Sequence, residues 1–285
     1  MKRKIIIFGS NGQLGSSLKK KIYKENNNIF FDSKNGDISD FKKIKNIFRN
    51  HKPNIVINCA AITNVDYCQK KKKNCNFINV VAVKNLSELC YNYNALLIHF
   101  SSDYIFNSNK KCLFREDSEK KPINFYGKSK LESEKKIIKS GCNYLIFRIS
   151  WLFSKKKENF LYFFKNAIKK NNHNKIYVSR NYGSPTSTRL VVKILNIFLK
   201  KKELLAYKKI FHLSCNGLAS WRAIFLHIRK RINKNSIGFK SVNKILSWNA
   251  KRPFCSKLSC NKIEKFLNMK LPHWKKELNH YLKSI

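Results

Sequence analysis

A tyrosine and a lysine stand four residues apart in the stretch Tyr126-Gly-Lys-Ser-Lys130. On a helix this spacing puts both side chains on one face, so they can point into one pocket. A free tyrosine has a pKa of about 10 and exchanges protons poorly at neutral pH, but a fixed ammonium beside it lowers that pKa. The pair therefore suits proton transfer to or from a carbonyl or hydroxyl oxygen. In so lysine-rich a chain, a packed tyrosine beside a solvated lysine is the alternative.

A glycine-rich turn near the N-terminus favours the chemical interpretation. The apolar run Ile5–Phe8 leads into Gly9-Ser-Asn-Gly12-Gln-Leu-Gly15. Glycines at a strand-to-helix junction permit a tight turn, close approach of the backbone to a pyrophosphate, and close packing of helix on strand. The helix expected from about Gly12 to Lys24 then aims its N-terminal amides at phosphate. The turn predicts a dinucleotide site, with an ordinary glycine-rich loop as the alternative.

Acidic residues after the second apolar run bear on which dinucleotide binds. Asp32 lies about 20 residues past the glycines, where a carboxylate can hold a ribose 2′-hydroxyl. This favours NADH, but Lys34 can pair with a 2′-phosphate, so NADPH stays open. Asp37 is placed to cap a helix near residues 40–50. Capping by Asp37, and contact of Asp37 and Ile38 with the adenine, are equally consistent with the sequence.

Two further apolar runs end in small or hydroxylated residues. The buried strand expected over 53–58 precedes Cys59-Ala-Ala-Ile-Thr63, where small side chains let a ligand approach the backbone. The strand expected over 96–100 precedes Ser101-Ser102-Asp103-Tyr104, read as a turn with no helix after it. Ligands bind at the carboxyl edge of parallel sheets, so Ser102 can hydrogen-bond a substrate carbonyl there. Trp151 follows the strand expected over 143–148 and can cover a sugar or a base; core packing is its alternative.

Strands and helices alternate through about residue 150, which predicts an α/β fold with a Rossmann-type doubly wound parallel sheet. We expect residues 1–150 to form a dinucleotide-binding Rossmann domain. Residues 151–285 are expected to form a smaller, mainly substrate-binding region, some elements of which return to the sheet. The pattern there predicts strands over 176–178 and 210–213, and helices over 159–170, 190–200, 221–232, 262–267 and 274–282.

Composition narrows the class of protein. The chain has 285 residues and a net charge of +44, which raises the question of nucleic acid. Its lysines are spread through almost every segment and no groove-reading or base-stacking motif appears, so we expect no specific nucleic-acid partner. No apolar run is long enough to span a bilayer. The N-terminal apolar run ends at Gly9, too early for a signal peptide, so we expect a strand there and a cytoplasmic protein.

The nine cysteines are an odd number and include no C-x-x-C pair. None stands with histidine at metal-ligand spacing, so we expect no metal site. We expect all nine to be reduced, mostly packed thiols.

Taken together, the motifs resemble the extended short-chain dehydrogenase/reductases, and within them the dTDP-4-dehydrorhamnose reductases. The similarity covers nearly the whole chain and is carried by the stretches 8–15, 58–66, 99–106, 126–130, 147–153, 182–186 and 252–253. It implies that Ser102, Tyr126 and Lys130 are catalytic, with Ser102 where relatives usually have threonine. It also implies two binding sets. One, for NADPH or NADH, is Gly9, Gly12, Gln13, Leu14, Gly15, Asp32, Asp37, Ile38, Ala60, Ala61, Thr63, Tyr126 and Lys130. The other, for the sugar nucleotide, is Ser102, Asp103 and Trp151.

The resemblance implies reduction of dTDP-4-dehydro-L-rhamnose by hydride from NADPH or NADH, in nucleotide-sugar and cell-surface polysaccharide biosynthesis. Tyr126 would protonate the oxygen, Lys130 would lower the pKa of Tyr126 and hold the nicotinamide ribose, and Ser102 would polarise the carbonyl. A homodimer and Mg²⁺ are compatible with the resemblance, but no metal ligands can be placed. The alternative is a non-catalytic regulatory subunit with a retained nucleotide site, similar to that of methionine adenosyltransferase. The intact catalytic set argues against it.

Three residues depart from the family pattern. Arg180-Asn181 stands where relatives commonly have Asp-Gln, and Phe254 follows Arg252-Pro253 where a small residue is usual. These changes leave the exact sugar nucleotide open.

Overall fold

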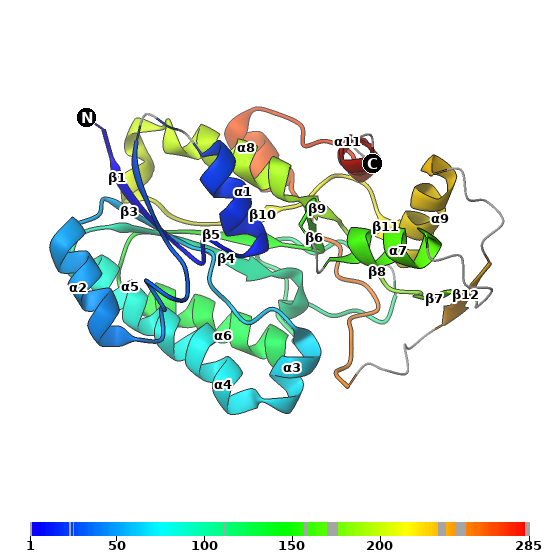
Figure 1. The fold of residues 1–285 in the computed structure, drawn as a ribbon, viewed down its shortest axis with the longest axis horizontal. Coiled ribbons are helices and arrows are strands. Elements are labelled where there is room, and N and C mark those ends of the chain that lie inside the picture. The colour runs from blue at the N-terminus through cyan, green and yellow to red at the C-terminus, as the bar shows by residue number, and fades with distance from the viewer. Residues whose placement is uncertain are drawn as a thin grey trace.

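A six-stranded parallel sheet forms the centre of the molecule, in a computed structural model that describes residues 2–22, 24, 26–110, 112–156, 159–169, 176–232, 238–242 and 249–282 (Figure 1). The strand order is β10-β5-β4-β3-β1-β2. The strands are β1 (Lys4–Phe8), β2 (Asn27–Phe31), β3 (Ile55–Asn58), β4 (Leu96–Ser102), β5 (Tyr144–Ile149) and β10 (Lys208–Leu213). All neighbouring pairs are parallel, which confirms the predicted doubly wound sheet.

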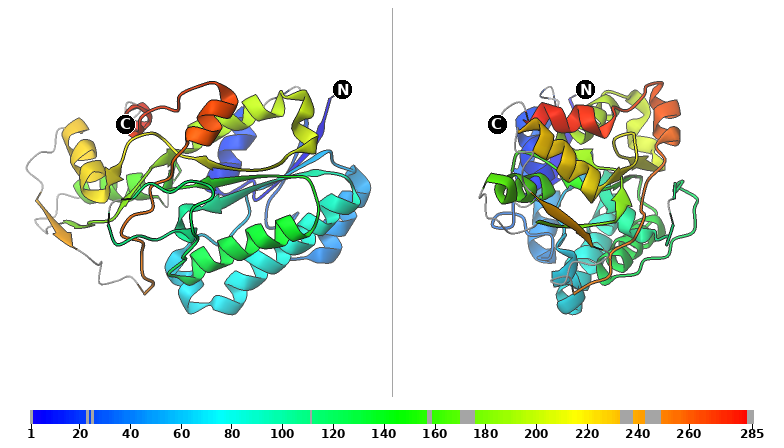
Figure 2. Two further views of the ribbon diagram at one scale, coloured as in Figure 1. Left: turned by 180° about the vertical axis from the view of Figure 1, so that it is seen from behind. Right: turned by 90° about the vertical axis from the view of Figure 1, so that its right-hand side faces the viewer.

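Helices cover both faces of the sheet (Figures 1 and 2). One face carries α1 (Gln13–Lys21) and α8 (Thr188–Leu199); the other carries α2 (Phe41–His51), α5 (Ala82–Asn92) and α6 (Phe125–Lys139). Successive residues of a strand point to opposite faces. Ile5 and Ile7 therefore join the core under α1 and α8, whereas Ile6 and Phe8 join the core under α2 and α5. Burial on both faces explains why these strands read as unbroken apolar runs.

Two local predictions on this framework are wrong. The N-cap of α2 is Asp40, whose side chain accepts the amide of Lys43, and not Asp37. Asp37 instead accepts the amide and hydroxyl of Ser39 in the preceding turn. After β4 a one-turn 3-10 helix, η2 (Asp103–Ile105), does follow, and the Ser102 hydroxyl caps it by accepting the amide of Tyr104.

Between β3 and β4 the chain forms α3 (Val65–Lys70), α4 (Lys72–Asn76) and a π-helical turn η1 (Phe77–Val81), which continues into α5. Residues 77–92 are therefore a π turn followed by an α-helix. Departures of this kind are frequent next to functional sites.

Most of the later elements gather beyond the carboxyl ends of the strands, at the right in Figure 1, while α8, β10 and α10 lie at the sheet. Short strand pairs join β6 (Leu152–Phe153) to β9 (Thr186–Ser187), β7 (Ile176–Ser179) to β12 (Phe239–Val242), and β8 (Tyr182–Gly183) to β11 (Ala219–Ser220). The remaining elements are η3 (Lys202–Ala206), α7 (Phe160–Lys169), α9 (Trp221–Arg231), α10 (Asn261–Leu267) and α11 (Trp274–Leu282). The predicted helix over 159–170 is confirmed as α7, and Lys170 lies outside the described residues.

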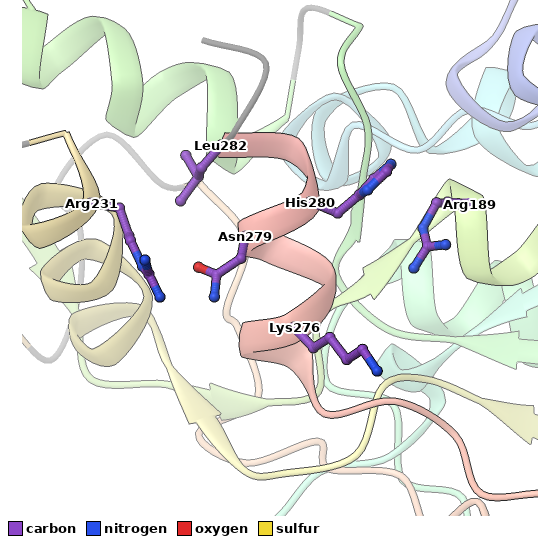
Figure 3. Close-up of a pocket in the computed structure, with 6 residues that line it drawn as sticks. All are labelled: Arg189, Arg231, Lys276, Asn279, His280 and Leu282. Atoms are coloured by element: carbon purple, nitrogen blue, oxygen red, sulfur yellow. The ribbon is translucent and has the colours of Figure 1, made fainter.

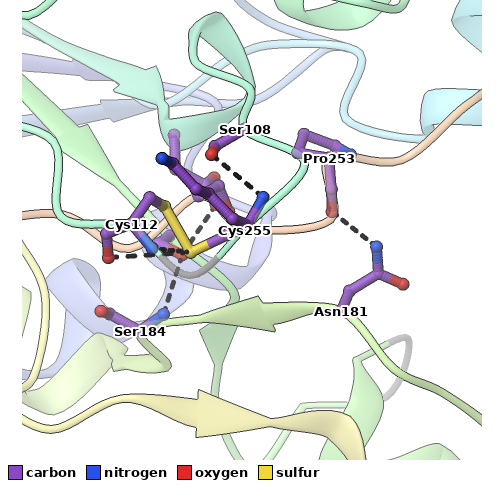
Figure 4. The surroundings of a disulfide bond; sticks show 10 residues. Ser108, Cys112, Asn181, Ser184, Pro253 and Cys255 are labelled. Carbon is purple, nitrogen blue, oxygen red and sulfur yellow. Dashed lines mark hydrogen bonds between the residues drawn. A yellow bond between two sulfur atoms is a disulfide. The ribbon is translucent and has the colours of Figure 1, made fainter.

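A disulfide joins Cys112 to Cys255, with Cα atoms 5.9 Å apart (Figure 4). The prediction that all nine cysteines are reduced is wrong for these two. Their positions are 143 residues apart and carry no spacing signal. They meet because the segment around Cys255 lies beside the loop after η2, where the Cys255 amide donates to the Ser108 carbonyl. The other seven cysteines are free, and all but Cys59 are buried.

In the described part of the chain, no group of three or more His, Cys, Asp and Glu side chains is placed to hold a metal ion. Nor does any helix among the described residues have the length and apolar character needed to cross a membrane.

Candidate functional site

A cleft of about 390 Å³ lies at the carboxyl edge of the sheet, and the sequence-predicted residues converge on it. The edge is where β1, β3, β4 and β5 all end, so loops that are far apart in sequence meet there. The cleft lining contains these predicted residues: Gly12, Gln13, Leu14, Ala60, Ala61, Thr63, Ser102, Asp103, Tyr126, Lys130 and Trp151. A separate cavity of about 580 Å³ near α9 and α11 contains none of them (Figure 3).

Gly9 and Gly15 shape the turn rather than line the cleft. Gly9 has φ +73°, and a Cβ there would lie 2.6 Å from the Ala60 amide nitrogen. A Cβ on Gly15 would meet the backbone of Gly9 and Ser10. Only glycine at these positions lets α1 pack closely on β1 and lets the turn reach the loop after β3.

The acidic residues of the predicted cofactor set lie outside the cleft lining. Asp32 is partly exposed just after β2, where its carboxylate accepts the side-chain amide of Asn11 at 2.7 Å. Backbone amides of Lys34 and Asn35 hold the pKa of Asp32 below its ordinary value. Ile38 is buried in the core beneath α2. The predicted roles of Asp32, Asp37 and Ile38 toward a cofactor stay predictions.

Tyr126 stands in the first turn of α6, which Asn124 caps by accepting the Gly127 amide at 2.8 Å. A Cβ on Gly127 would be in contact with the Tyr104 carbonyl, so glycine lets the helix start directly against η2. The ring of Tyr126 meets Tyr104 edge-on, with centroids 5.8 Å apart. Burial raises the pKa of Tyr126, and a hydrogen bond with Ser102 offsets only part of that rise.

The expected net lowering of the Tyr126 pKa is therefore wrong, because burial dominates that pKa. Lys130 is only 2% exposed, and its Nζ lies 3.3 Å from His99 Nε2, beneath the helix. Burial lowers the pKa of Lys130 to about 8, against a smaller raising effect of Glu134. Glu134 itself is held by the Arg148 guanidinium at 2.7 Å, which fastens α6 to β5.

Asp103 is a buried carboxylate surrounded by hydroxyl groups. It accepts Ser256 Oγ at 2.5 Å, Ser150 Oγ at 2.8 Å and Ser102 Oγ at 3.2 Å. Burial raises its pKa to about 6, and the three hydroxyls limit that rise. Asp103 thus connects η2 to Ser150, directly after β5, and to Ser256 in the C-terminal part of the chain.

An aromatic wall closes one side of the cleft. The indole of Trp151 stacks on that of Trp221 with centroids 4.2 Å apart and planes inclined by 13°. Trp151 has φ +44°, an uncommon conformation for a large side chain. A Cβ on Gly183 would lie 2.6 Å from the indole, so β8 must carry glycine there. The structure therefore places Trp151 in the cleft as well as in contact with other aromatic rings.

The segment 249–252, which includes Arg252, is held beside the site by contacts with Asp66. The Arg252 guanidinium lies 2.7 Å from the carboxylate of Asp66 at the start of α3. Burial alone would raise the pKa of Asp66, but Arg252 and the amides of Asn249 and Ala250 outweigh it and lower the pKa. Asn124, the cap of α6, also donates to the Lys251 carbonyl at 2.9 Å. The helix that carries Tyr126 and this segment thus share contacts.

Sequence analysis assigned no role to three residues of this site: His99, Trp221 and Ser256. His99 and Ser256 contact predicted residues through side chains, and Trp221 lines the cleft. No spacing rule identifies them, because each meets its partner only through tertiary structure. A buried polar residue inside a strand of apolar residues is the one available signal, and it applies to His99.

Comparisons with known proteins agree with this geometry. The profile of the RmlD substrate binding domain matches residues 3–285. The chain belongs to this family. The dTDP-4-dehydrorhamnose reductase of Escherichia coli (strain K12) is 27% identical over 285 residues, covering 95% of this chain and 94% of that protein.

Solved structures of dTDP-4-dehydrorhamnose reductases match nearly the whole chain. The dTDP-4-dehydrorhamnose reductase of Bacillus anthracis, in complex with NADP, has a TM-score of 0.90 and 27% identity and covers 100% of both chains. A dTDP-4-dehydrorhamnose reductase ortholog from Clostridium acetobutylicum has a TM-score of 0.90 and 31% identity and covers 99% of both chains. The resemblance inferred from the motifs is confirmed, as is the Rossmann-type fold.

Proposed function

We propose that this chain reduces dTDP-4-dehydro-L-rhamnose to dTDP-L-rhamnose with NADPH or NADH, in nucleotide-sugar biosynthesis for cell-surface polysaccharide. The observation that carries the proposal is the convergence of Ser102, Tyr126 and Lys130 on the cleft that the glycine turn also lines. The full-length match to reductases supports it over the alternative of a regulatory subunit. The chain covers 94% of the Escherichia coli reductase and 100% of the Bacillus anthracis structure.

The residues fit a dinucleotide. Gly12, Ala60 and Ala61 present backbone and small side chains to the cleft, and the turn is held open by glycines where a Cβ would collide. The first residues of α1 line the same cleft, and the amides of a helix N-terminus suit phosphate binding. Gly12, Gln13, Leu14, Ala60, Ala61 and Thr63 would hold the cofactor together with Lys130. When bound, NADPH or NADH supplies hydride to the keto carbon.

Proton supply to the keto oxygen is the task of the side chains. Burial raises the pKa of Tyr126, so its phenol stays protonated at neutral pH and is able to give its proton to the developing alkoxide. The Ser102 hydroxyl, which donates to Asp103 in this structure, would turn its proton toward the same oxygen when the substrate is bound. Lys130 holds the cofactor ribose in this proposal, and its charge then compensates the phenolate that is left. Hydride to carbon and proton to oxygen balance the reduction.

The sugar nucleotide is assigned to the side of the cleft built by later residues. Asp103 and Trp151, with Ser102, are proposed to contact it, and Trp221 supports the Trp151 indole. The division into residues 1–150 for the dinucleotide and 151–285 mainly for substrate belongs to the same proposal. A homodimer, a cytoplasmic location and a contribution of Mg²⁺ stay predictions.

One assay tests the function. Purified protein is mixed with dTDP-4-dehydro-L-rhamnose and NADPH or NADH, and loss of reduced cofactor is followed with product identification by mass spectrometry. We expect stoichiometric oxidation of the cofactor and formation of dTDP-L-rhamnose. Saturation with both ligands and no oxidised cofactor over hours would reject the reductase and favour the regulatory subunit.

Arg180 is expected to matter little to the substrate. Its side chain is exposed and does not line the cleft, whereas the neighbouring Asn181 is buried and donates to the Pro253 carbonyl at 2.5 Å. An exposed charge contributes at most about 1 kcal/mol. Arg180→Asp should therefore keep kcat and change the KM for the sugar nucleotide by less than about 5-fold. Steady-state kinetics of both variants check this, with Asn181→Ala expected to raise the KM more than Arg180→Asp does. A larger effect of Arg180→Asp would mean that the Arg180 charge acts on the substrate.

The high positive charge predicts weak, nonspecific association with DNA. Net charge is +44, but lysines are spread along the chain. Binding that rests on phosphate contacts weakens steeply with salt, so duplex binding should be sequence-independent and lost by about 200 mM salt. Fluorescence anisotropy with two unrelated duplexes measures this. Tight binding that distinguishes the duplexes at that salt would contradict the prediction.

A further inference from the structure

A buried imidazole lies beneath the helix that carries Tyr126 and Lys130. His99 is 1% exposed in β4 and stands directly beside Asn58 of β3 in the parallel register. Alternation along β4 puts His99 on the same face as Leu97, which packs in the core under α5 and α6. The fold therefore delivers a polar ring to an otherwise apolar layer.

Three polar groups surround the ring. His99 Nδ1 lies 3.3 Å from Asn58 Nδ2, while Nε2 lies 3.3 Å from Lys130 Nζ and 3.4 Å from Ser133 Oγ. Lys130 and Ser133 are three residues apart on α6, so both face the sheet at the same level. The imidazole thus connects β3 to α6 at the floor of the cleft.

Asn58 determines which ring nitrogen carries the proton. The Ala60 amide donates to Asn58 Oδ1 at 3.0 Å, which turns the Asn58 NH₂ group toward the ring. An NH₂ group only donates, so Nδ1 must accept. Burial, followed by the charge of Lys130, holds the pKa of His99 well below its ordinary value, so the ring is neutral. The proton therefore sits on Nε2, the nitrogen that faces Lys130 and Ser133.

The Nε2–H group needs a hydrogen-bond acceptor, and two atoms lie near enough to be considered: Ser133 Oγ and Lys130 Nζ. Ser133 Oγ donates its own proton to the Lys130 carbonyl at 2.7 Å and keeps lone pairs to accept one. Lys130 Nζ can accept only as an uncharged amine, because an ammonium has no lone pair. The contact with His99 therefore favours the amine form of Lys130 at this position.

We propose that His99 is a positioning residue for Lys130: its ring, with the proton on Nε2 that Asn58 fixes, supports Nζ at the floor of the cleft and disfavours the ammonium relative to the amine. The inference rests on the proposed function and extends it from Lys130 to the residue behind it. Other titratable groups face Lys130 as well: Cys68 of α3, Cys75 of α4 and Glu134 of α6, all of which favour its ammonium. The His99 contact acts in the opposite sense to these groups.

The first test concerns the ionisation of Lys130. The affinity for NADPH is measured as a function of pH by fluorescence titration, with no sugar nucleotide present. In the wild type, affinity should fall as pH rises through about 8, where Lys130 loses its proton. In His99→Gln the amide oxygen can turn toward the ammonium, so the midpoint should move upward by about 1 pH unit. His212→Gln is the matched control, since His212 is also buried in the sheet but contacts Arg148. An unchanged midpoint in His99→Gln, or an equal shift in His212→Gln, would overturn the proposal.

Removal of the imidazole gives the second test. His99→Leu changes the support beneath Nζ, and misplacement of a catalytic group by about 1 Å can cost about 100-fold. We expect kcat/KM to fall about 10- to 100-fold in His99→Leu and to recover to within about 5-fold of wild type in His99→Gln. Equal losses in both variants, with unchanged unfolding midpoints, would contradict a positioning role.

Nuclear magnetic resonance of ¹⁵N-histidine-labelled protein reads the ring directly. The signals that disappear in His99→Gln belong to His99. They should report a neutral ring protonated on Nε2 from about pH 6 to 9. A proton on Nδ1 would overturn the proposal. This measurement and the NADPH titration need no dTDP-sugar, so their failure is distinguishable from failure of the reductase assignment.

Discussion

Tyr126→Phe is expected to lower kcat by about 100-fold or more and to leave the affinity for NADPH near that of the wild type. The phenol is the proton donor in the proposed reduction, and phenylalanine removes only that group. The edge-on contact with the Tyr104 ring and the cap of α6 by Asn124 do not involve the hydroxyl, so the helix should keep its place. Steady-state kinetics and a fluorescence titration with NADPH measure the two quantities.

Tyr104→Phe is the matched control for this prediction. Tyr104 also lines the cleft, and burial raises the pKa of its phenol too. Its hydroxyl has no part in the proposed chemistry, so kcat should change by less than about 5-fold. Turnover near that of the wild type in Tyr126→Phe would remove Tyr126 from the mechanism, and a large loss in Tyr104→Phe would reassign the proton donor.

The architecture of the sheet could be predicted because its signals are local. Each central strand is a short apolar run bounded by polar or small residues, and each intervening helix has its own apolar face. The N-cap residue of α2 was harder to predict from the sequence. Asp37 and Asp40 both suit a cap before α2, and only the course of the preceding turn, where Asp37 binds Ser39, selects Asp40.

The site was predictable as a set of residues but not as a set of contacts. Spacing put Tyr126 and Lys130 on one helix face, yet the long lysine side chain reaches His99, which comes from the register of β3 with β4. The pKa of Tyr126 was predicted in the wrong direction because the neighbouring charge was considered and burial was not. Cys112 and Cys255 lie too far apart in sequence for any local rule to join them.

Lys130→Met should have opposite effects on activity and on stability. Loss of the ammonium is expected to lower kcat/KM by about 100-fold or more, because cofactor positioning and charge compensation are both removed. The same ammonium is costly to bury. The pKa of Lys130 is lowered from an ordinary 10.5 to about 8, so the unfolded chain binds the proton more tightly than the folded one. At pH values below 8 the charge thus destabilises the fold, by at most about 3 kcal/mol.

The sign of this linkage fixes the pH dependence. Between pH 8 and 10.5 the unfolded chain carries more protons at this position, so wild-type stability rises with pH relative to Lys130→Met. Methionine fills much the same space without a charge. Urea unfolding should therefore show Lys130→Met to be the more stable protein at pH 7, with the difference shrinking toward pH 10.5.

Lys128→Met provides the control, since Lys128 lies on the same helix with its side chain exposed. It should change neither kcat/KM nor the free energy of unfolding by much, because an exposed lysine has no burial to reverse. A Lys130→Met protein less stable than the wild type at pH 7 would mean that the contacts of Nζ with its neighbours outweigh its desolvation. If the Lys130 charge is buried because catalysis needs it, Lys130→Met should lose activity and gain stability.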